Sequence, residues 1–263
     1  KLFFDGLPKG AFALTNDDDR NGRVMVQNTA AAVSTYSLRA MADFRCKIVE
    51  MHLDGMLLRI DGQELWVGLL GRFNAYNLLA VYGAAVLLGL DRGEVLRVLS
   101  VLHAVSGRFE KVRAANGTTA IVDYAHTPDA LENVIQTIEE IRTPEQQLIV
   151  VCGCGGDRDR TKRPEMAQIA VKYASTAIFT SDNPRHESPE AILDDMVAGL
   201  DPGVRYLRIA DRAEAIRTAV MLSRPGDILL IAGKGHETYQ VVGDVKHHFD
   251  DREEVRKSFE LLN

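Results

Sequence analysis

A glycine-rich segment near the middle of the chain gathers four cationic side chains. The stretch GCGGDRDRTKR, residues 153–163, mixes flexible glycine positions with arginine and lysine. Glycine lets a backbone approach a ligand closely, and clustered cations attract an anion. The segment therefore predicts an anion site, with a solvated basic face as the competing interpretation. Its cations are Arg158, Arg160, Lys162 and Arg163.

Two further short segments carry groups that bind opposite charges. Asn183 and Arg185 flank Pro184, so one rigid turn presents an amide and a planar guanidinium. Arginine binds carboxylates through two parallel hydrogen bonds, although an Asn-Pro-Arg turn on its own is more often structural. In GKGHE, Gly233 allows close backbone approach and Glu237 offers a carboxylate to an ammonium. A substrate that carries both signs of charge would suit these segments.

The segment DYAHTPD adds an acid and a histidine. Asp123 follows an apolar run, a place where acidic residues hold ribose hydroxyls in dinucleotide-binding folds. His126 could contact phosphate, or it could serve as a structural hydrogen-bonding residue. A nucleotide contact is therefore one of two open interpretations here.

Other chemistry has weaker support in the sequence. No G-x-x-x-x-G-K-[ST] occurs, and no Ser or Thr follows Lys234, so the usual phosphate-binding loop is absent from this sequence. Cys152 and Cys154 form C-x-C without a second pair at zinc spacing, which favours structural thiols. His247 and His248 are expected in an exposed polar turn.

The candidate segments each follow an apolar run that reads as a strand. Beyond residue 106, strands alternate with amphipathic helices, a pattern typical of a parallel sheet covered on both faces. The predicted strands are TTAIVDY, QLIVVC, TAIFTSD, VRYLRIA and DILLIAG, and helices are expected at TPDALENVIQTIEEI, RPEMAQIAVKYA, SPEAILDDMVAGL, DRAEAIRTAVMLS and DREEVRKSFELL. Because parallel strands end at one edge of a sheet, all four segments should lie along it.

The first part of the chain has a different pattern. Its predicted strands are AFALT, RVMVQN, FRCKIVEMHLD, GMLLRID and ELWVGLL, and D-G breaks join the last three into an antiparallel meander. Helical spacing follows over residues 74–105, with Asp91 capping a second helix. We place the domain boundary near Ser106, which gives domains 1–106 and 107–263.

The composition is that of an ordinary globular α/β protein. The 263 residues are 46% hydrophobic and carry a net charge of −6, with a pI near 5.7. This balance argues against a nucleic-acid or anionic-membrane partner. Three cysteines without a pairing pattern and no run of about 18 apolar residues indicate a soluble protein of the reducing cytoplasm. The opening KLFFDG lacks a start methionine, so we expect an N-terminal truncation.

Taken together, the segments resemble the MurE branch of the ATP-dependent Mur ligases. Family members have a UDP-sugar domain, a central ATP-binding domain and a C-terminal Rossmann-like domain that binds the incoming amino acid. The resemblance implies that residues 1–106 are the C-terminal part of the central domain and that 107–263 are the Rossmann-like domain. The matching stretches are GRFNAYNLLA, SGRFE, VDYAHTPDALENV, GCGGDRDRTKRPEM, SDNPRHESPEAI and AGKGHETYQ.

The resemblance also implies roles for individual residues. Asn74 and Asn77 would face the adenine of ATP. Arg108 would reach the phosphates, Asp123 would hold the ribose, and His126 would lie near the nucleotide, which makes Arg108 and His126 the catalytic candidates. The phosphate loop and the carbamylated lysine that helps to hold magnesium are expected upstream of Lys1, so no metal ligand is expected in this chain. The residues implied for meso-diaminopimelate are Arg158, Asp182, Asn183, Pro184, Arg185, Gly233 and Glu237.

Arg185 is the main basis for choosing the amino acid, because lysine-adding relatives generally lack this arginine. Meso-diaminopimelate carries one carboxylate more than lysine, and Arg185 with Arg158 could bind it. A buried cation that faced lysine would stay unpaired, at a cost of several kcal/mol. Glu237 would bind the ammonium beside that carboxylate.

The implied reaction adds meso-diaminopimelate to UDP-MurNAc-L-Ala-D-Glu through an acyl phosphate, with ATP and Mg²⁺ as cofactors. The enzyme is expected to be a cytoplasmic monomer with no nucleic-acid or membrane partner. One alternative is a ligase that adds lysine or another diamine, and another is a non-catalytic fragment that binds an amino acid or nucleotide. The 263-residue chain is expected to be inactive by itself.

Overall fold

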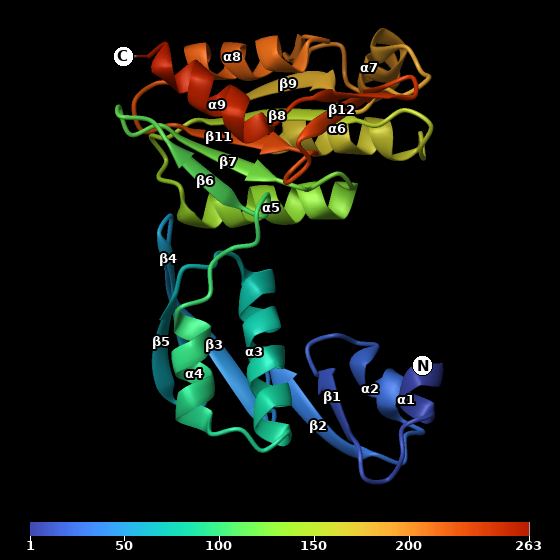
Figure 1. Ribbon diagram of the computed structural model, residues 1–263, viewed down its shortest axis with the longest axis vertical. Helices are drawn as coiled ribbons and strands as arrows, with labels where there is room; N and C mark the ends of the chain where they lie inside the picture. The colour runs from blue at the N-terminus through green and yellow to red at the C-terminus, as the bar shows by residue number, and fades with distance from the viewer. Residues whose placement is uncertain (263) are drawn as a thin grey trace. The chain divides into compact units, whose positions relative to one another are not determined.

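The computed structural model describes residues 1–262 (Figure 1). They form two compact units, residues 1–103 and the residues from 104 onward. No helix among the described residues is long and apolar enough to cross a membrane.

A six-stranded sheet in the order β10-β9-β8-β11-β7-β6 is the centre of the second unit. All neighbouring strands pair in parallel except β6, which runs antiparallel to β7. The predicted mainly parallel sheet is thereby confirmed. The strands are β6 (Glu110–Arg113), β7 (Thr119–Asp123), β8 (Leu148–Cys154), β9 (Thr176–Ser181), β10 (Leu207–Arg208) and β11 (Ile228–Ala232).

Helices cover both faces of this sheet, as the alternating pattern predicted (Figure 1). On one face lie α5 (Pro128–Ile141), α6 (Lys162–Tyr173) and α7 (Pro189–Val197). On the other lie α8 (Arg212–Leu222) and α9 (Asp251–Glu260).

The predicted start of α5 is confirmed in detail. The Thr127 side chain accepts a hydrogen bond from the Ala130 amide, and Pro128 occupies the first turn, where its missing N–H costs nothing.

The central strands are buried along their whole length. β7, β8 and β11 are apolar at almost every position, as expected for strands covered on both faces. Ala232 pairs with Asp123, and Ile231 lies opposite both Val122 and Val151, so these strands end close to level. The segments after β7, β8, β9 and β11 therefore share one edge of the sheet, which confirms the predicted arrangement.

Two details of the second unit differ from the predictions. VRYLRIA contributes only the two-residue β10, since this edge strand pairs on one side alone. His247 and His248 do not lie in a turn but in β13 (Val245–His248), which forms an antiparallel hairpin with β12 (Tyr239–Val242). The hairpin turn is at Gly243, whose φ of +58° suits glycine.

The first unit contains a five-stranded sheet in the order β1-β2-β3-β4-β5. The predicted meander is confirmed, because β3, β4 and β5 pair in antiparallel register. Both predicted helices are also present, and the Asp91 side chain caps the second by accepting from the Glu94 amide at 2.9 Å. The elements are α1 (Leu2–Asp5), β1 (Phe12–Asn16), α2 (Gly22–Val26), β2 (Ala32–Ser37), β3 (Phe44–His52), β4 (Gly55–Ile60), β5 (Gln63–Val67), α3 (Arg72–Leu87) and α4 (Arg92–Ser100).

The strand predicted at RVMVQN is wrong, because this segment forms the short helix α2. β1 and β2 pair in parallel, so the chain between them must cross over rather than turn back. α2 belongs to that connection. It begins at Gly22, where an added Cβ would stand only 2.0 Å from the Asn16 carbonyl oxygen.

Candidate active site

The Asp-Asn-Pro-Arg turn follows β9 and forms backbone hydrogen bonds with the β12–β13 hairpin. Arg185 has a φ of +50°, an uncommon conformation for a residue other than glycine. The Arg185 amide donates to the Val241 carbonyl at 3.0 Å, and the Gly243 amide donates to the Arg185 carbonyl at 2.7 Å. These bonds to the hairpin hold the strained backbone in place.

A buried network links this turn to the GKGHE segment after β11. The Asn183 amide nitrogen donates to Glu237 Oε2 at 2.9 Å. The fully buried Lys234 ammonium lies 3.2 Å from both Asn183 Oδ1 and Glu237 Oε2. Gly233 lies beside Asp182, since an added Cβ would stand 2.6 Å from Asp182 Oδ2.

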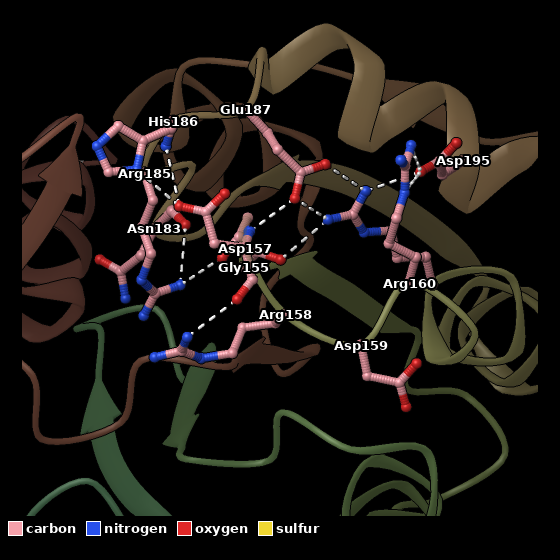
Figure 2. A network of polar contacts seen from close by, with 12 residues as sticks. Gly155, Asp157, Arg158, Asp159, Arg160, Asn183, Arg185, His186, Glu187 and Asp195 are labelled. Carbon is pink, nitrogen blue, oxygen red and sulfur yellow. Dashed lines mark hydrogen bonds and ion pairs between the residues drawn. The ribbon is translucent and has the colours of Figure 1, made fainter.

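Arg158 and Arg185 both border Gly155, where an added Cβ would lie 2.9 Å from Arg185 Nη1 and 3.8 Å from Arg158 Cγ. Arg185 Nη1 donates to the Gly156 carbonyl at 2.9 Å, and Arg158 Nη1 donates to the Asp157 carbonyl at 3.0 Å (Figure 2). These bonds reach backbone oxygens rather than carboxylates. The two guanidinium groups therefore keep their charge for an anionic ligand.

Two other cations of residues 153–163 are paired with carboxylates. Arg163 is completely buried and binds Glu187 through two bonds of 2.8 and 2.9 Å. It also binds Asp195, which is shared with Arg160. Lys162 Nζ donates to the His126 carbonyl at 2.7 Å. The segment is therefore not an anion site built from four free cations, because Arg160 and Arg163 are paired with carboxylates, whereas Arg158 and Lys162 donate to backbone carbonyls.

Asp123 lies at the end of β7 and is buried, with 4% of its surface exposed. Its Oδ2 accepts from the Phe109 amide at 2.7 Å, which ties the turn that carries Arg108 to the sheet. Burial raises the pKa of the Asp123 carboxyl, and bonds from backbone amides partly offset the effect. The Asp123 carboxylate thus has a structural role in this turn, in addition to its predicted role in ribose binding.

Tyr124 is the centre of a cluster in the second unit. The Arg108 guanidinium stacks over the Tyr124 ring at 4.8 Å, and the rings of His126 and His236 lie 4.6 and 5.0 Å from it. His126 Nδ1 is 2.8 Å from the Tyr124 carbonyl oxygen. Both catalytic candidates, Arg108 and His126, therefore contact one tyrosine, for which the sequence indicated no role.

Asn74 and Asn77 lie on one side of α3 in the first unit. Asn74 Nδ2 donates to the Leu70 carbonyl at 2.7 Å, and Asn77 Nδ2 lies 3.5 Å from Asn74 Oδ1. Between them in sequence, Tyr76 donates to Asp18 at 2.8 Å. Burial and this hydrogen bond raise the pKa of Tyr76 to about 12, so the phenol stays protonated.

A buried ion pair stabilises the ends of β9 and β11. Arg212 at the start of α8 and Asp251 at the start of α9 are completely buried and joined by bonds of 2.7 and 2.8 Å. Arg212 also donates to the carbonyls of Ser181 and Ala232, the last residues of β9 and β11. The pair thus fixes the strand ends from which two site segments leave. A lone arginine and a distant aspartate carry no sequence signal of this role.

Models of two protein domains match this chain. The Mur ligase middle domain matches residues 1–85, and the Mur ligase glutamate ligase domain matches residues 107–235. The chain belongs to the Mur ligase family.

Within that family, the chain is similar to proteins named UDP-N-acetylmuramoyl-L-alanyl-D-glutamate–2,6-diaminopimelate ligase. It is 58% identical over 261 residues to the one from Parabacteroides distasonis and 45% identical over 251 residues to the one from Bacillus cereus. The first match covers 98% of this chain and 54% of the relative. The chain thus spans about half the length of the relatives it matches.

Solved structures agree with this placement. A structure of a diaminopimelate ligase of the same name has 39% identity and a TM-score of 0.66, covering 95% of this chain and 53% of that one. A Thermotoga maritima MurF ligase in complex with ADP has a TM-score of 0.67 and covers 98% of this chain and 55% of that one. Its identity is 15%, so it supports the fold alone.

Proposed function

We propose that the complete protein joins meso-diaminopimelate to UDP-MurNAc-L-Ala-D-Glu in an ATP- and Mg²⁺-dependent reaction of the cytoplasm. The observation that carries this proposal is the convergence of opposite charges at one sheet edge. Arg158 and Arg185 border Gly155, while Asn183 joins the same turn to the Glu237 carboxylate. A ligand with a carboxylate and an ammonium on one carbon can meet both.

The charges match meso-diaminopimelate better than lysine. One carboxylate of the ligand would be bound by the guanidinium of Arg185 with help from Arg158, and the neighbouring ammonium by Glu237. Lysine has the ammonium without that carboxylate, so it would leave the cations unpaired. The second amine of diaminopimelate would remain free to attack. Relatives named diaminopimelate ligases at 45–58% identity support this choice over a lysine-adding enzyme.

ATP would supply the phosphoryl group that activates the glutamate carboxyl. The exposed Arg108 guanidinium is suited to phosphate oxygens, and the amides of Asn74 and Asn77 are suited to an adenine edge. His126 and Asp123 would lie near the nucleotide. No group of three or more metal-binding side chains occurs within residues 1–262.

We further propose functional domains at 1–106 and 107–263 in a monomeric enzyme. The division of the structure into compact units between His103 and Ala104 supports a boundary in this region.

The test compares amino-acid binding by the complete protein and by Arg185→Ala, using calorimetry with meso-diaminopimelate and with L-lysine. We expect wild type to prefer diaminopimelate and Arg185→Ala to lose at least tenfold in its affinity, because a charge-assisted pair disappears. Arg205→Ala, an exposed arginine of the same unit, is the matched control and should bind as wild type does. Equal binding of both amino acids by wild type would refute the proposed substrate.

A further inference from the structure

Lys234 is a buried cation that none of the roles above uses. Its side chain is 0% exposed, yet an ammonium buried without a counter-charge is costly. Its nitrogen lies 3.2 Å from Glu237 Oε2, 3.2 Å from Asn183 Oδ1 and 5.7 Å from the centre of the Tyr239 ring. The lysine is therefore held by the two residues proposed to bind the amino acid.

Hydrogen bonding around Lys234 leaves one particular atom available. Asn183 Oδ1 accepts from Lys234 and from the Val241 amide at 2.9 Å, while Asn183 Nδ2 donates to Glu237 Oε2. Glu237 Oε2 thus has two donors. No bond to Glu237 Oε1 is found within the described residues, and its side chain is 16% exposed. An incoming ammonium would meet Oε1.

The charge of Lys234 also acts on the ligand. At 3.2 Å, its ammonium cancels much of the attraction that Glu237 would exert on a second cation. Arg158 and Arg185 add two further positive charges beside Gly155. A ligand whose side chain ends only in an ammonium is therefore held weakly. A ligand with a carboxylate beside the ammonium can pair with Arg158 and Arg185 as well as with Glu237.

We propose that Lys234 is a positioning and specificity residue of the amino-acid site. It orients Glu237 so that Oε1 alone receives the ammonium, and its charge disfavours diamines that lack the second carboxylate. This inference rests on the proposed diaminopimelate-adding function.

The experiment measures steady-state KM values of the complete protein for meso-diaminopimelate, L-lysine and ATP. Lys234→Met removes the charge with little change in volume, and Lys234→Gln removes the charge but keeps a donor. Lys246→Met is the matched control, because Lys246 is exposed and stacks on the same Tyr239 ring at 4.1 Å without contacting Asn183 or Glu237.

We expect Lys234→Met to raise KM for diaminopimelate at least tenfold, leave KM for ATP within twofold, and lower the preference for diaminopimelate over lysine at least tenfold. Lys234→Gln should lower the preference in the same direction, and it decides the matter if the methionine variant does not fold. Lys246→Met should match wild type. An unchanged preference would overturn the proposal, and so would a parallel change in KM for all three substrates, which indicates a structural role. Failure of wild type to use diaminopimelate would instead refute the proposed function.

Discussion

At the scale of single residues, charge pairing decides which side chains remain available to a ligand. Arg158 and Arg163 occur in the same short segment and have the same chemistry. Arg163 is completely buried against Glu187 and Asp195, whereas Arg158 is exposed and bonded only to a backbone carbonyl. Arg163 therefore stabilises the segment, and Arg158 remains available to a substrate.

Glu187 provides a test of this pairing through the pH dependence of stability. The hydrogen bonds from Arg163 lower the pKa of Glu187 to about 2 from an ordinary value of 4.5. Because the folded-state pKa is depressed, the stabilisation is complete above pH 4.5 and is lost as the pH falls toward 2. We expect Glu187→Gln to lower the free energy of unfolding by about 2 kcal/mol at pH 7. Urea unfolding at pH 7 and pH 3 should show a smaller difference from wild type at pH 3.

Glu260→Gln is the control for this experiment, because Glu260 is exposed at the end of α9. It should change the free energy of unfolding little at either pH. A Glu187→Gln effect of equal size at both pH values would show that the ion pair is not its cause.

At the scale of elements, close backbone approach sets the geometry of the proposed amino-acid site. The segment after β8 and the turn after β9 lie so close that a Cβ on Gly156 would stand 1.9 Å from the Pro184 carbonyl oxygen. The Gly156 amide donates to the Asn183 carbonyl at 2.9 Å. The two segments therefore hold each other, while the β12–β13 hairpin holds the turn from its other side.

Gly156→Ala should separate these segments while leaving the sheet intact. We expect a loss of about 1–3 kcal/mol in the free energy of unfolding, the usual cost of overpacking. Binding of meso-diaminopimelate should weaken at least tenfold, because Arg185 and Asn183 would move with the turn. Calorimetry and urea unfolding measure the two effects. Gly203→Ala, with nothing within 4 Å of the added Cβ, should resemble wild type, and normal binding by Gly156→Ala would contradict the proposed geometry.

At the scale of the whole molecule, the strand order brings separate segments of the chain together. β11 inserts between β7 and β8, although nearly 75 residues separate it from β8 in the sequence. The GKGHE segment consequently reaches the turn that carries Asn183 and Arg185. The proposed amino-acid site is thus assembled from three connections of one sheet, those after β8, β9 and β11.

The 263-residue chain is expected to have no ligase activity by itself. Its sequence contains no G-x-x-x-x-G-K-[ST] loop, and it spans about half the length of its relatives. Phosphate release in the presence of ATP, Mg²⁺, UDP-MurNAc-L-Ala-D-Glu and meso-diaminopimelate should stay at background. The complete protein is the positive control, and release by the short chain at a comparable rate would refute the expectation.

The sequence by itself determined the helices from α3 onward, most of the strands and the family, because periodic apolar residues, caps such as Thr127 and long motifs are local signals. It also placed four polar segments at one sheet edge. It misassigned the segment of α2, where a short apolar run resembles a strand but a parallel pair of strands requires a crossover.

Only the tertiary structure decided which charges pair. Arg163 meets Glu187 and the hairpin holds Arg185 at positive φ, each through residues far apart in the sequence. Lys234 meets Glu237 within one loop, whose path the fold sets. A charged side chain in a sequence has many possible partners, and desolvation makes a partner obligatory only where the fold buries it. For this reason the sequence indicated the kinds of group at the site, and the fold selected those left free to bind.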